Sequence, residues 1–397
     1  MSKKWFNILV LSAVAFILNG CDLNPFHDDE DKYNESLSEI RPYQRVAIIS
    51  GTKEDIKRIS LAISDYIVYT NEEKELNFPS NWTIAGANPQ ENETYDRDYD
   101  LIHMPVDTGN GVYKSRIVEL CNANYAKEAV ASSQHYGSAL PFEVSVHSDG
   151  KNVYVDMLDS KALFSLFFSN SKDKDSLKSM AKTINFEIRT MIFKALVEES
   201  VTESTKQLGP KFTQGELNRI QERNVYKIGK YQSTIDNNFT NQDVKQLAET
   251  IISTFGNSRS TADINVPSVS SGSSWRSARD NPIVLKNIYI IEAYSETYAK
   301  MVTKLGAEYL TALPCEVSVY LDDEDSTGGT IGISILNPNF VFDTMLKDAV
   351  ENAVNTKKIT KEEEKEYDNL ASIVLSDLYK IVNTAIVDSG LSLKKVN

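Results

Sequence analysis

The sequence has few of the residues that usually build a catalytic or metal centre. It contains three cysteines and four histidines in 397 residues. The histidines show no metal-ligand spacing such as i, i+4 on a helix, and Cys121 has no second cysteine two residues away. A glycine-rich phosphate loop, a nucleophile elbow and a paired-acid motif are also missing. We therefore predict no metal and no cofactor, and we find no set of residues that would make the chain an enzyme.

Positive charge is scarce as well. The chain has 42 basic and 56 acidic side chains, a formal net charge of −14. This balance repels phosphate backbones and anionic lipid headgroups, which excludes nucleic acid as a partner. The acidic turn from Asp322 to Asp325 lacks the alternating ligands and central glycine of a calcium loop. We interpret it as a solvated turn.

The N-terminus carries an apolar run, Ile8 to Leu18, that is too short to cross a bilayer comfortably. It follows two lysines at positions 3 and 4, which is the layout of a secretory signal peptide. The run ends in Leu-Asn-Gly-Cys at residues 18–21, which resembles the lipobox of bacterial lipoproteins. The resemblance implies diacylglyceryl transfer to the Cys21 sulfur, cleavage after Gly20, and acylation of the new terminus with a fatty acid such as palmitate.

These features predict that the protein is located in the cell envelope. Residues 1–20 would be the signal peptide and residues 21–41 an acidic, flexible tether, with the soluble part facing the periplasm. Asp22 resembles the inner-membrane retention signal of enteric bacteria, but the choice between inner and outer membrane stays open. The alternatives are a plain signal peptide with a chance cysteine and an uncleaved anchor helix.

An internal repeat organises the rest of the chain. An offset of 173 positions aligns Tyr125-Ala126-Lys127 with Tyr298-Ala299-Lys300, and residues 143–146 with residues 316–319. Eleven of the 22 positions from 125 to 146 are identical without a gap. This agreement is too extensive to arise by chance, so we infer a duplicated domain.

The periodicity predicts the same order of elements in both copies: a strand, a helix, a long loop, a strand, a short helix, a hairpin and a final helix. Threonine caps are expected before the first helices, at Thr52 and Thr240. We expect the long loops at residues 70–113 and 256–282, and the closing helices at 176–199 and 362–389. The predicted domains are residues 42–201 and 225–397, joined by a polar linker at 202–224.

The motifs of the second copy are similar to those of the domain of unknown function family 302. They are Tyr-Ala-Lys, then Leu-Pro-Cys, then Leu-Asn-Pro at residues 336–338. The first copy matches less well, because it has Phe142 where the second has Cys315. The resemblance implies an α+β fold made of two tandem antiparallel-sheet domains with helices on one face, shaped like the halves of the TATA-box-binding protein and arranged as a pseudo-dimer. It transfers no catalytic residue, and the shape alone carries no DNA function.

The repeated motifs also supply candidate contact residues for a ligand or partner. They are Tyr125, Lys127, Tyr298, Lys300 and Cys315. A tyrosine at the start of a short helix is more often a core anchor whose hydroxyl reaches a partner at the edge. Alternation places Cys315 on the apolar side of its strand, and the equivalent glutamates 143 and 316 on the opposite, polar face.

Cys121 and Cys315 remain after lipidation, and two interpretations stay open for them. An oxidising envelope compartment would allow a disulfide between them, whereas the simpler alternative is two separately buried thiols.

Our leading hypothesis for function is a non-catalytic envelope lipoprotein. Its paired domains would present a groove or sheet face to a small apolar ligand or an envelope protein partner, and the loop at residues 70–113 is the most elaborated candidate contact. The first alternative is an envelope redox protein or enzyme that uses Cys121, Cys315 and the paired tyrosines. A second alternative is a structural spacer without a ligand site.

Overall fold

The structure is a computed structural model of the full chain. It describes residues 40–73, 82–84, 101–106, 113–132, 134, 137, 140, 142–168, 171–213, 216, 225–234, 238–256, 258, 275–277, 282–285, 287–312, 315–322 and 329–396. The predicted signal peptide, Cys21 and most of the tether lie outside the described residues, as do most of the linker after residue 213 and the acidic turn after Asp322.

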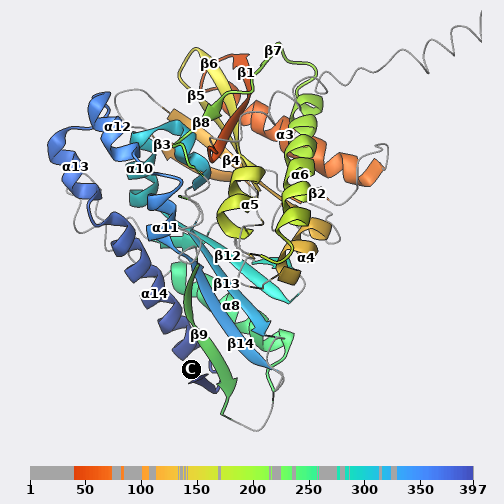
Figure 1. The fold of residues 1–397 in the computed structure, drawn as a ribbon, viewed down its shortest axis with the longest axis vertical. Helices are drawn as coiled ribbons and strands as arrows, with labels where there is room; N and C mark the ends of the chain where they lie inside the picture. The colour runs from red at the N-terminus through yellow and green to blue at the C-terminus, as the bar shows by residue number, and fades with distance from the viewer. Residues whose placement is uncertain are drawn as a thin grey trace, which may run out of the picture.

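The chain has a mixed α+β fold with two antiparallel sheets, as predicted (Figure 1). The first half contains β1 (Tyr43–Ser50), α3 (Asp55–Glu73), β2 (Trp82–Ile84), β3 (Leu101–Val106), β4 (Tyr113–Asn122), α4 (Ala123–Ser132), β5 (Phe142–Ser148), β6 (Asn152–Leu158), α5 (Ser160–Phe168), α6 (Lys174–Ala195), β7 (Val201–Glu203) and β8 (Gln207–Leu208). The second half contains β9 (Val225–Ser233), α8 (Asn241–Gly256), β10 (Trp275–Ser277), β11 (Ile283–Leu285), β12 (Ile288–Ser295), α10 (Glu296–Leu305), η3 (Ala307–Ala312), β13 (Cys315–Asp322), β14 (Thr330–Leu336), α11 (Pro338–Asp343), α12 (Ala349–Asn355), α13 (Lys361–Tyr367), α14 (Leu370–Asp388) and β15 (Leu393–Val396).

The two sheets share one strand order. The first runs β2-β4-β5-β6-β1-β7 and the second β10-β12-β13-β14-β9-β15. Their registers agree as well, because Ser145 faces Ile117 in the first sheet and Ser318 faces Ile290 in the second. Equivalent elements therefore occupy equivalent places in the two halves.

A bulge at the same place in each sheet supports this equivalence. The pairing of β1 with β6 shifts between Arg45 and Ala47, and that of β9 with β14 shifts across Ile228. A bulge adds one unpaired residue and increases the local twist of the strand. Because the bulged residues Val46 and Ile228 are both buried, each strand turns an extra apolar side chain into its own core.

The first helix of each half begins as the sequence predicts. Thr52 donates its backbone N–H to Asp55 Oδ2 at 2.9 Å, and Thr240 donates its own to Asp243 Oδ2 at 2.7 Å. These bonds satisfy amides that the helix leaves without an internal acceptor. The buried faces of the two helices repeat at helical spacing and consist of Ile56, Ile59, Ile63 and Ile67 in α3 and Val244, Leu247, Ile251 and Phe255 in α8.

Some segments differ from the predictions. The expected long loop at 70–113 contributes β2 and β3 to the first sheet, because short edge strands of three to six residues carry too little periodicity to be recognised. The start of the expected linker, residues 202–208, forms most of β7 and all of β8, which pair with β1. The closing helix of the second half is divided into α13 and α14.

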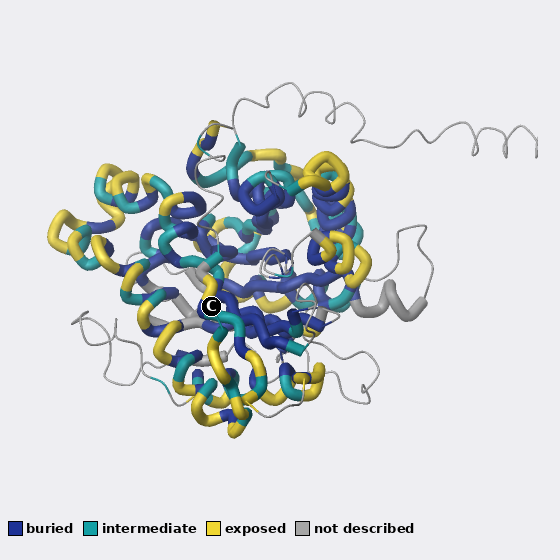
Figure 2. Tube along the Cα trace, turned by 60° about the horizontal axis from the view of Figure 1, so that its bottom comes forward, coloured by how far each residue is buried: buried dark blue, intermediate teal, exposed yellow. Residues whose placement is uncertain are grey.

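Helices cover one face of each sheet, and the other face turns toward the opposite half. In the first half α3 packs on β4 and β5 beside α6, and in the second α8 packs on β12 and β13 beside α14. Across the junction, η3 of the second half packs on β4, β5 and β6 of the first. In return, Gly137 of the first half lies against Ile290 and Ser318 of the second sheet. The buried residues of both sheets thus lie between the outer helices (Figure 2).

Helix α14 belongs to the core of the second half. The segment Lys361–Asp388 that contains it is long and apolar enough to cross a membrane by length and composition alone. In the fold α14 packs along α8 and α11, and its residues Leu370, Val374, Leu378 and Val382 are buried. This is the position of a core helix in a globular domain.

Candidate functional site

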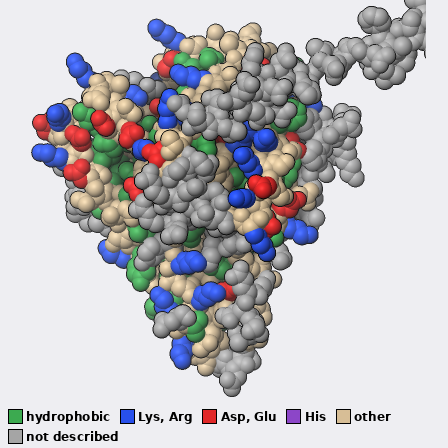
Figure 3. Space-filling view, viewed as in Figure 1, with side chains coloured by type: hydrophobic (Ala, Val, Ile, Leu, Met, Phe, Trp, Pro, Cys, Tyr) green, Lys and Arg blue, Asp and Glu red, His purple; other side chains and the backbone are tan. Residues whose placement is uncertain are grey.

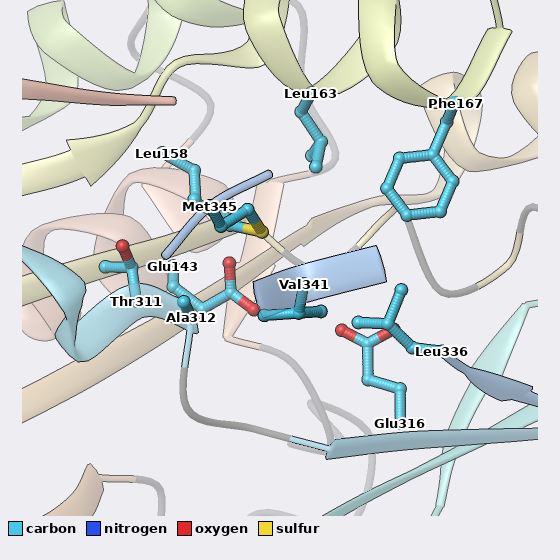
Figure 4. A pocket seen from close by; sticks show the side chains of 10 residues that line it. All are labelled: Glu143, Leu158, Leu163, Phe167, Thr311, Ala312, Glu316, Leu336, Val341 and Met345. Carbon is cyan, nitrogen blue, oxygen red and sulfur yellow. The ribbon is translucent and has the colours of Figure 1, made fainter. Parts of the chain in front are cut away.

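A small cavity lies at the junction of the two halves (Figure 4). Its volume is about 20 Å3, which is room for roughly one water molecule. The first half and the second half each contribute to its wall. The lining residues are Glu143, Leu158, Leu163, Phe167, Thr311, Ala312, Glu316, Leu336, Val341 and Met345.

Equivalent positions of the duplication face each other across this cavity. Glu143 and Glu316 are related by the offset of 173, and both stand near the start of the first strand of a hairpin, β5 or β13. After the longer second hairpin the offset becomes 178, which relates Leu158 to Leu336 and residues 163 and 167 to residues 341 and 345. The cavity is therefore built around an approximate twofold relation between the halves.

The carboxyl groups at the cavity belong to a set of four buried glutamates. Glu119 pairs with Glu143 across β4 and β5, and Glu292 pairs with Glu316 across β12 and β13. All four side chains are at most 3% exposed. The glutamates do lie on the sheet face opposite the helices, but that face is buried, because the other half of the chain covers it.

Burial makes Glu143 hard to ionise. Removal from water, together with the negative charges of Glu316 and Glu119, raises the pKa of Glu143 well above its ordinary value. The folded protein therefore holds a proton there at a pH where the unfolded chain has lost it. The cavity thus presents hydrogen-bonding carboxyl groups within an apolar wall.

Two equivalent short helices, α5 and α11, form the apolar side of the cavity. Leu163 and Phe167 project from α5, and Val341 projects from α11. The rings of Phe167 and Phe340 meet edge to face across the junction, with centroids 5.5 Å apart. Nearby, the Tyr43 hydroxyl donates to the Met345 carbonyl oxygen at 2.9 Å. These contacts fix the two halves against each other around the cavity.

The lining of the cavity offers groups that can contact a small ligand. Within the part of the chain that the structure describes, no group of three or more His, Cys, Asp or Glu residues is placed to hold a metal ion. Carboxyl groups and apolar walls can instead hold a small ligand through hydrogen bonds, charge and dispersion.

The predicted contact residues of the first half lie away from this cavity. Tyr125, at the start of α4, donates its hydroxyl to Glu187 Oε1 at 2.9 Å, and the indole of Trp82 donates to Glu187 Oε2 at 2.8 Å. The second half repeats part of this arrangement, where the Trp275 indole donates to Asp377 at 3.2 Å. Tyr125 is thus engaged at the edge of the helical layer, and Lys127 is exposed beside it.

The predicted contact residues of the second half are mostly internal. Tyr298 is 2% exposed and packs against the ring of Phe342, whereas the side chain of Lys300 lies outside the described residues. Cys315 lies on the helical face of β13, in register with Val317 and Val319. Its sequence neighbour Glu316 points the other way, into the cavity.

The two cysteines are not bonded to each other. Cys121 lies on β4 of the first sheet and Cys315 on β13 of the second, and both are buried thiols. Of the two interpretations left open by the sequence, the structure has two separate thiols, because the cysteines lie on different sheets, one in each half. Burial and the nearby Glu316 raise the pKa of the Cys315 thiol. A thiol that holds its proton is a poor nucleophile, which weakens the redox alternative.

A second buried polar cluster was not recognised from the sequence. Asp156 on β6 accepts bonds from Arg45 at 2.8 and 3.0 Å and lies 2.8 Å from Nε2 of His147. The Arg45 guanidinium also lies over the Tyr154 ring, 3.9 Å from its centroid. The second half has Ser334 at the position of Asp156. The cluster is thus specific to the first half and lies on its junction face.

The face seen in Figure 3 shows no large patch of one kind of side chain among the described residues. Acidic and basic side chains both occur there, and hydrophobic side chains show only in small groups. The junction, with its cavity and its buried ionisable residues, is therefore the candidate functional site.

Comparisons with known proteins agree with the resemblance to an uncharacterised family. The model of the family "Domain of unknown function DUF302" matches residues 107–193. The matched segment lies in the first half, so the expectation that the second copy would match better is wrong. No curated protein matches the sequence. A solved structure described as an uncharacterized conserved protein DUF302 from Bacillus stearothermophilus is 11% identical, with a TM-score of 0.27, and the match covers 38% of this chain and 97% of that one. The chain contains a DUF302-like domain.

Proposed function

We propose that this chain is a lipid-anchored cell-envelope protein in which two tandem DUF302-like domains form a non-catalytic binding module. The observation that carries the proposal is the cavity at the junction, which both halves line with equivalent residues. Duplicated domains that meet around a shared cavity can bind a ligand that neither domain encloses alone. The bound species is a small ligand rather than a macromolecule, because the cavity is small.

The N-terminal sequence supports the proposed location in the cell envelope. The basic residues, the short apolar run and the lipobox-like residues 18–21 together match an exported lipoprotein. Two or three acyl chains attached at Cys21 would hold the protein at the membrane, because each buried methylene adds about 0.8 kcal/mol. The acidic residues that follow favour a solvated connection to a body that faces the periplasm.

The anchor gives the first prediction. Changing Cys21→Ala removes the only thiol that can accept the lipid at this position, so we expect the protein to move from the membrane fraction to the soluble fraction, or to accumulate unprocessed. Fractionation followed by intact mass measurement distinguishes these forms from the mature lipidated protein. The matched control is Cys121→Ala, which should remain in the membrane fraction. Retention of Cys21→Ala in the membrane at the mature mass would refute the anchor.

A further inference from the structure

The cavity between the halves presents acidic groups and no basic group. Glu143 and Glu316 line it, and no lysine, arginine or histidine is among the ten residues of its wall. Glu119 and Glu292 stand directly beside these two on the neighbouring strands. Four carboxyl groups are therefore gathered at a junction from which water is largely removed, which is unfavourable for any that ionise.

Some polar atoms of the wall lack a hydrogen-bond partner within the described residues. Glu143 Oε2 and Thr311 Oγ1 are among them, and both side chains are 3% exposed. Figure 4 shows the carboxyl groups of Glu143 and Glu316 within the ring of labelled side chains. A buried acceptor without a donor is costly, so these atoms point to a bound species that satisfies them.

The volume of the cavity and the few oxygen atoms of its wall limit which species can bind. A volume of about 20 Å3 admits roughly one group of the size of a water molecule. Calcium takes six to eight oxygen ligands and magnesium demands a near-octahedral set, and the described residues offer no group arranged to hold such an ion. Ammonium is a hydrogen-bond donor of about the size of a water molecule, so a few acceptor oxygens can hold it, and its charge compensates a buried carboxylate.

We propose that the cavity binds one ammonium ion between Glu143, Glu316 and Thr311. The inference rests on the proposed binding module and names the ligand of its shared cavity. The ammonium ion donates hydrogen bonds to the carboxylates and to the threonine hydroxyl oxygen. Cation and proton compete for the same carboxylates, so binding strengthens as the pH rises.

The test is urea unfolding of the full mature protein at constant ionic strength, with ammonium, potassium or sodium chloride exchanged for tetramethylammonium chloride. A ligand that binds only the folded state stabilises it in proportion to the logarithm of its concentration above the dissociation constant. We expect a stabilisation by ammonium that is absent in tetramethylammonium, which is too large to enter.

Variants identify the site. Glu143→Gln keeps the shape of the side chain and removes its charge, and it should weaken the cation effect about tenfold or more, as the loss of a charged partner does. Thr311→Val provides a second, uncharged change at the same wall and should weaken it less. Glu351→Gln, at an exposed position on α12, is the matched control and should leave the effect unchanged.

Two results would overturn the inference: equal unfolding midpoints in all four salts, or an undiminished cation effect in Glu143→Gln and Thr311→Val together. Circular dichroism of each variant shows whether it has folded. Either result would leave the anchored binding module standing with a different ligand, because the anchor is tested separately at Cys21.

Discussion

Replacing Asp156 with alanine is expected to lower the free energy of unfolding by about 3–5 kcal/mol. Asp156 is 1% exposed and accepts two bonds from Arg45 and one contact from His147. Its removal leaves the mostly buried Arg45 guanidinium without its counter-ion, and an uncompensated buried charge is the main source of the cost. Urea unfolding followed by circular dichroism measures the difference.

The duplication supplies the control for this variant. Ser334 holds the equivalent place in the second sheet and is also fully buried, but it carries no charge. Ser334→Ala should therefore change the stability by about 1 kcal/mol or less. If Asp156→Ala lowers the free energy of unfolding no more than Ser334→Ala does, the ion pair contributes little to stability.

Asp156 also predicts how the free energy of unfolding depends on pH. Burial tends to raise its pKa, but the hydrogen bonds and charges of His147 and Arg45 outweigh burial and lower the pKa of Asp156. Its stabilising contribution is present above the pKa of the unfolded chain and is lost as the pH falls through the folded value. Glu143, whose pKa is raised, acts in the opposite direction and costs stability as the pH rises. The wild type should lose more stability than Asp156→Ala on acidification below about pH 4.

Replacing Phe340 with alanine should destabilise both halves together, by about 3–5 kcal/mol. Phe340 is 1% exposed, and its ring packs on Phe167 of the first half. Loss of the ring leaves a cavity in the junction that α5 and α11 share. Each half carries its own buried tryptophan, Trp82 in the first and Trp275 in the second. In protein that lacks residues 1–20, which contain Trp5, the Trp82→Phe and Trp275→Phe backgrounds leave one fluorescent reporter each.

Both reporters should follow one transition in the otherwise unchanged protein and move to lower urea together in Phe340→Ala. Phe186, which is 42% exposed on α6, is the matched control, and its replacement by alanine should change stability by about 0.5 kcal/mol or less. If the two tryptophans unfold at different midpoints before any change at Phe340, the halves are independent domains and the junction is not a fixed site.

Sequence reasoning predicted the repeated elements because their signals are local. The threonine starts at Thr52 and Thr240 are short-range patterns, and the alternation from Glu143 shows which side chains share a face. The short strands β2 and β3 and the edge strand β7 lack such a signal, since few residues show no clear period. The pairing of β2 and β7 is also decided by strands far along the chain.

The candidate site was missed for a related reason. The sequence placed Glu143 and Glu316 correctly on the face opposite the helices, but whether that face meets water or a second domain depends on how the halves pack. One signal was available, because both glutamates lie in the segment Glu-Val-Ser-Val, which is identical in the two copies. Asp156 had no such signal, since the second copy replaces it with Ser334.

The most direct test of the shared cavity as the binding site is native mass spectrometry of the protein extracted gently from membranes, compared with Ala312→Val. Ala312 lines the cavity, and two added carbons there would fill a space with room for about one water. We predict that the wild type carries a small bound species that the Ala312→Val variant lacks. We also predict that the wild type and the variant both begin at a lipidated Cys21. An equal bound mass in both proteins, or none in the wild type, would contradict the account.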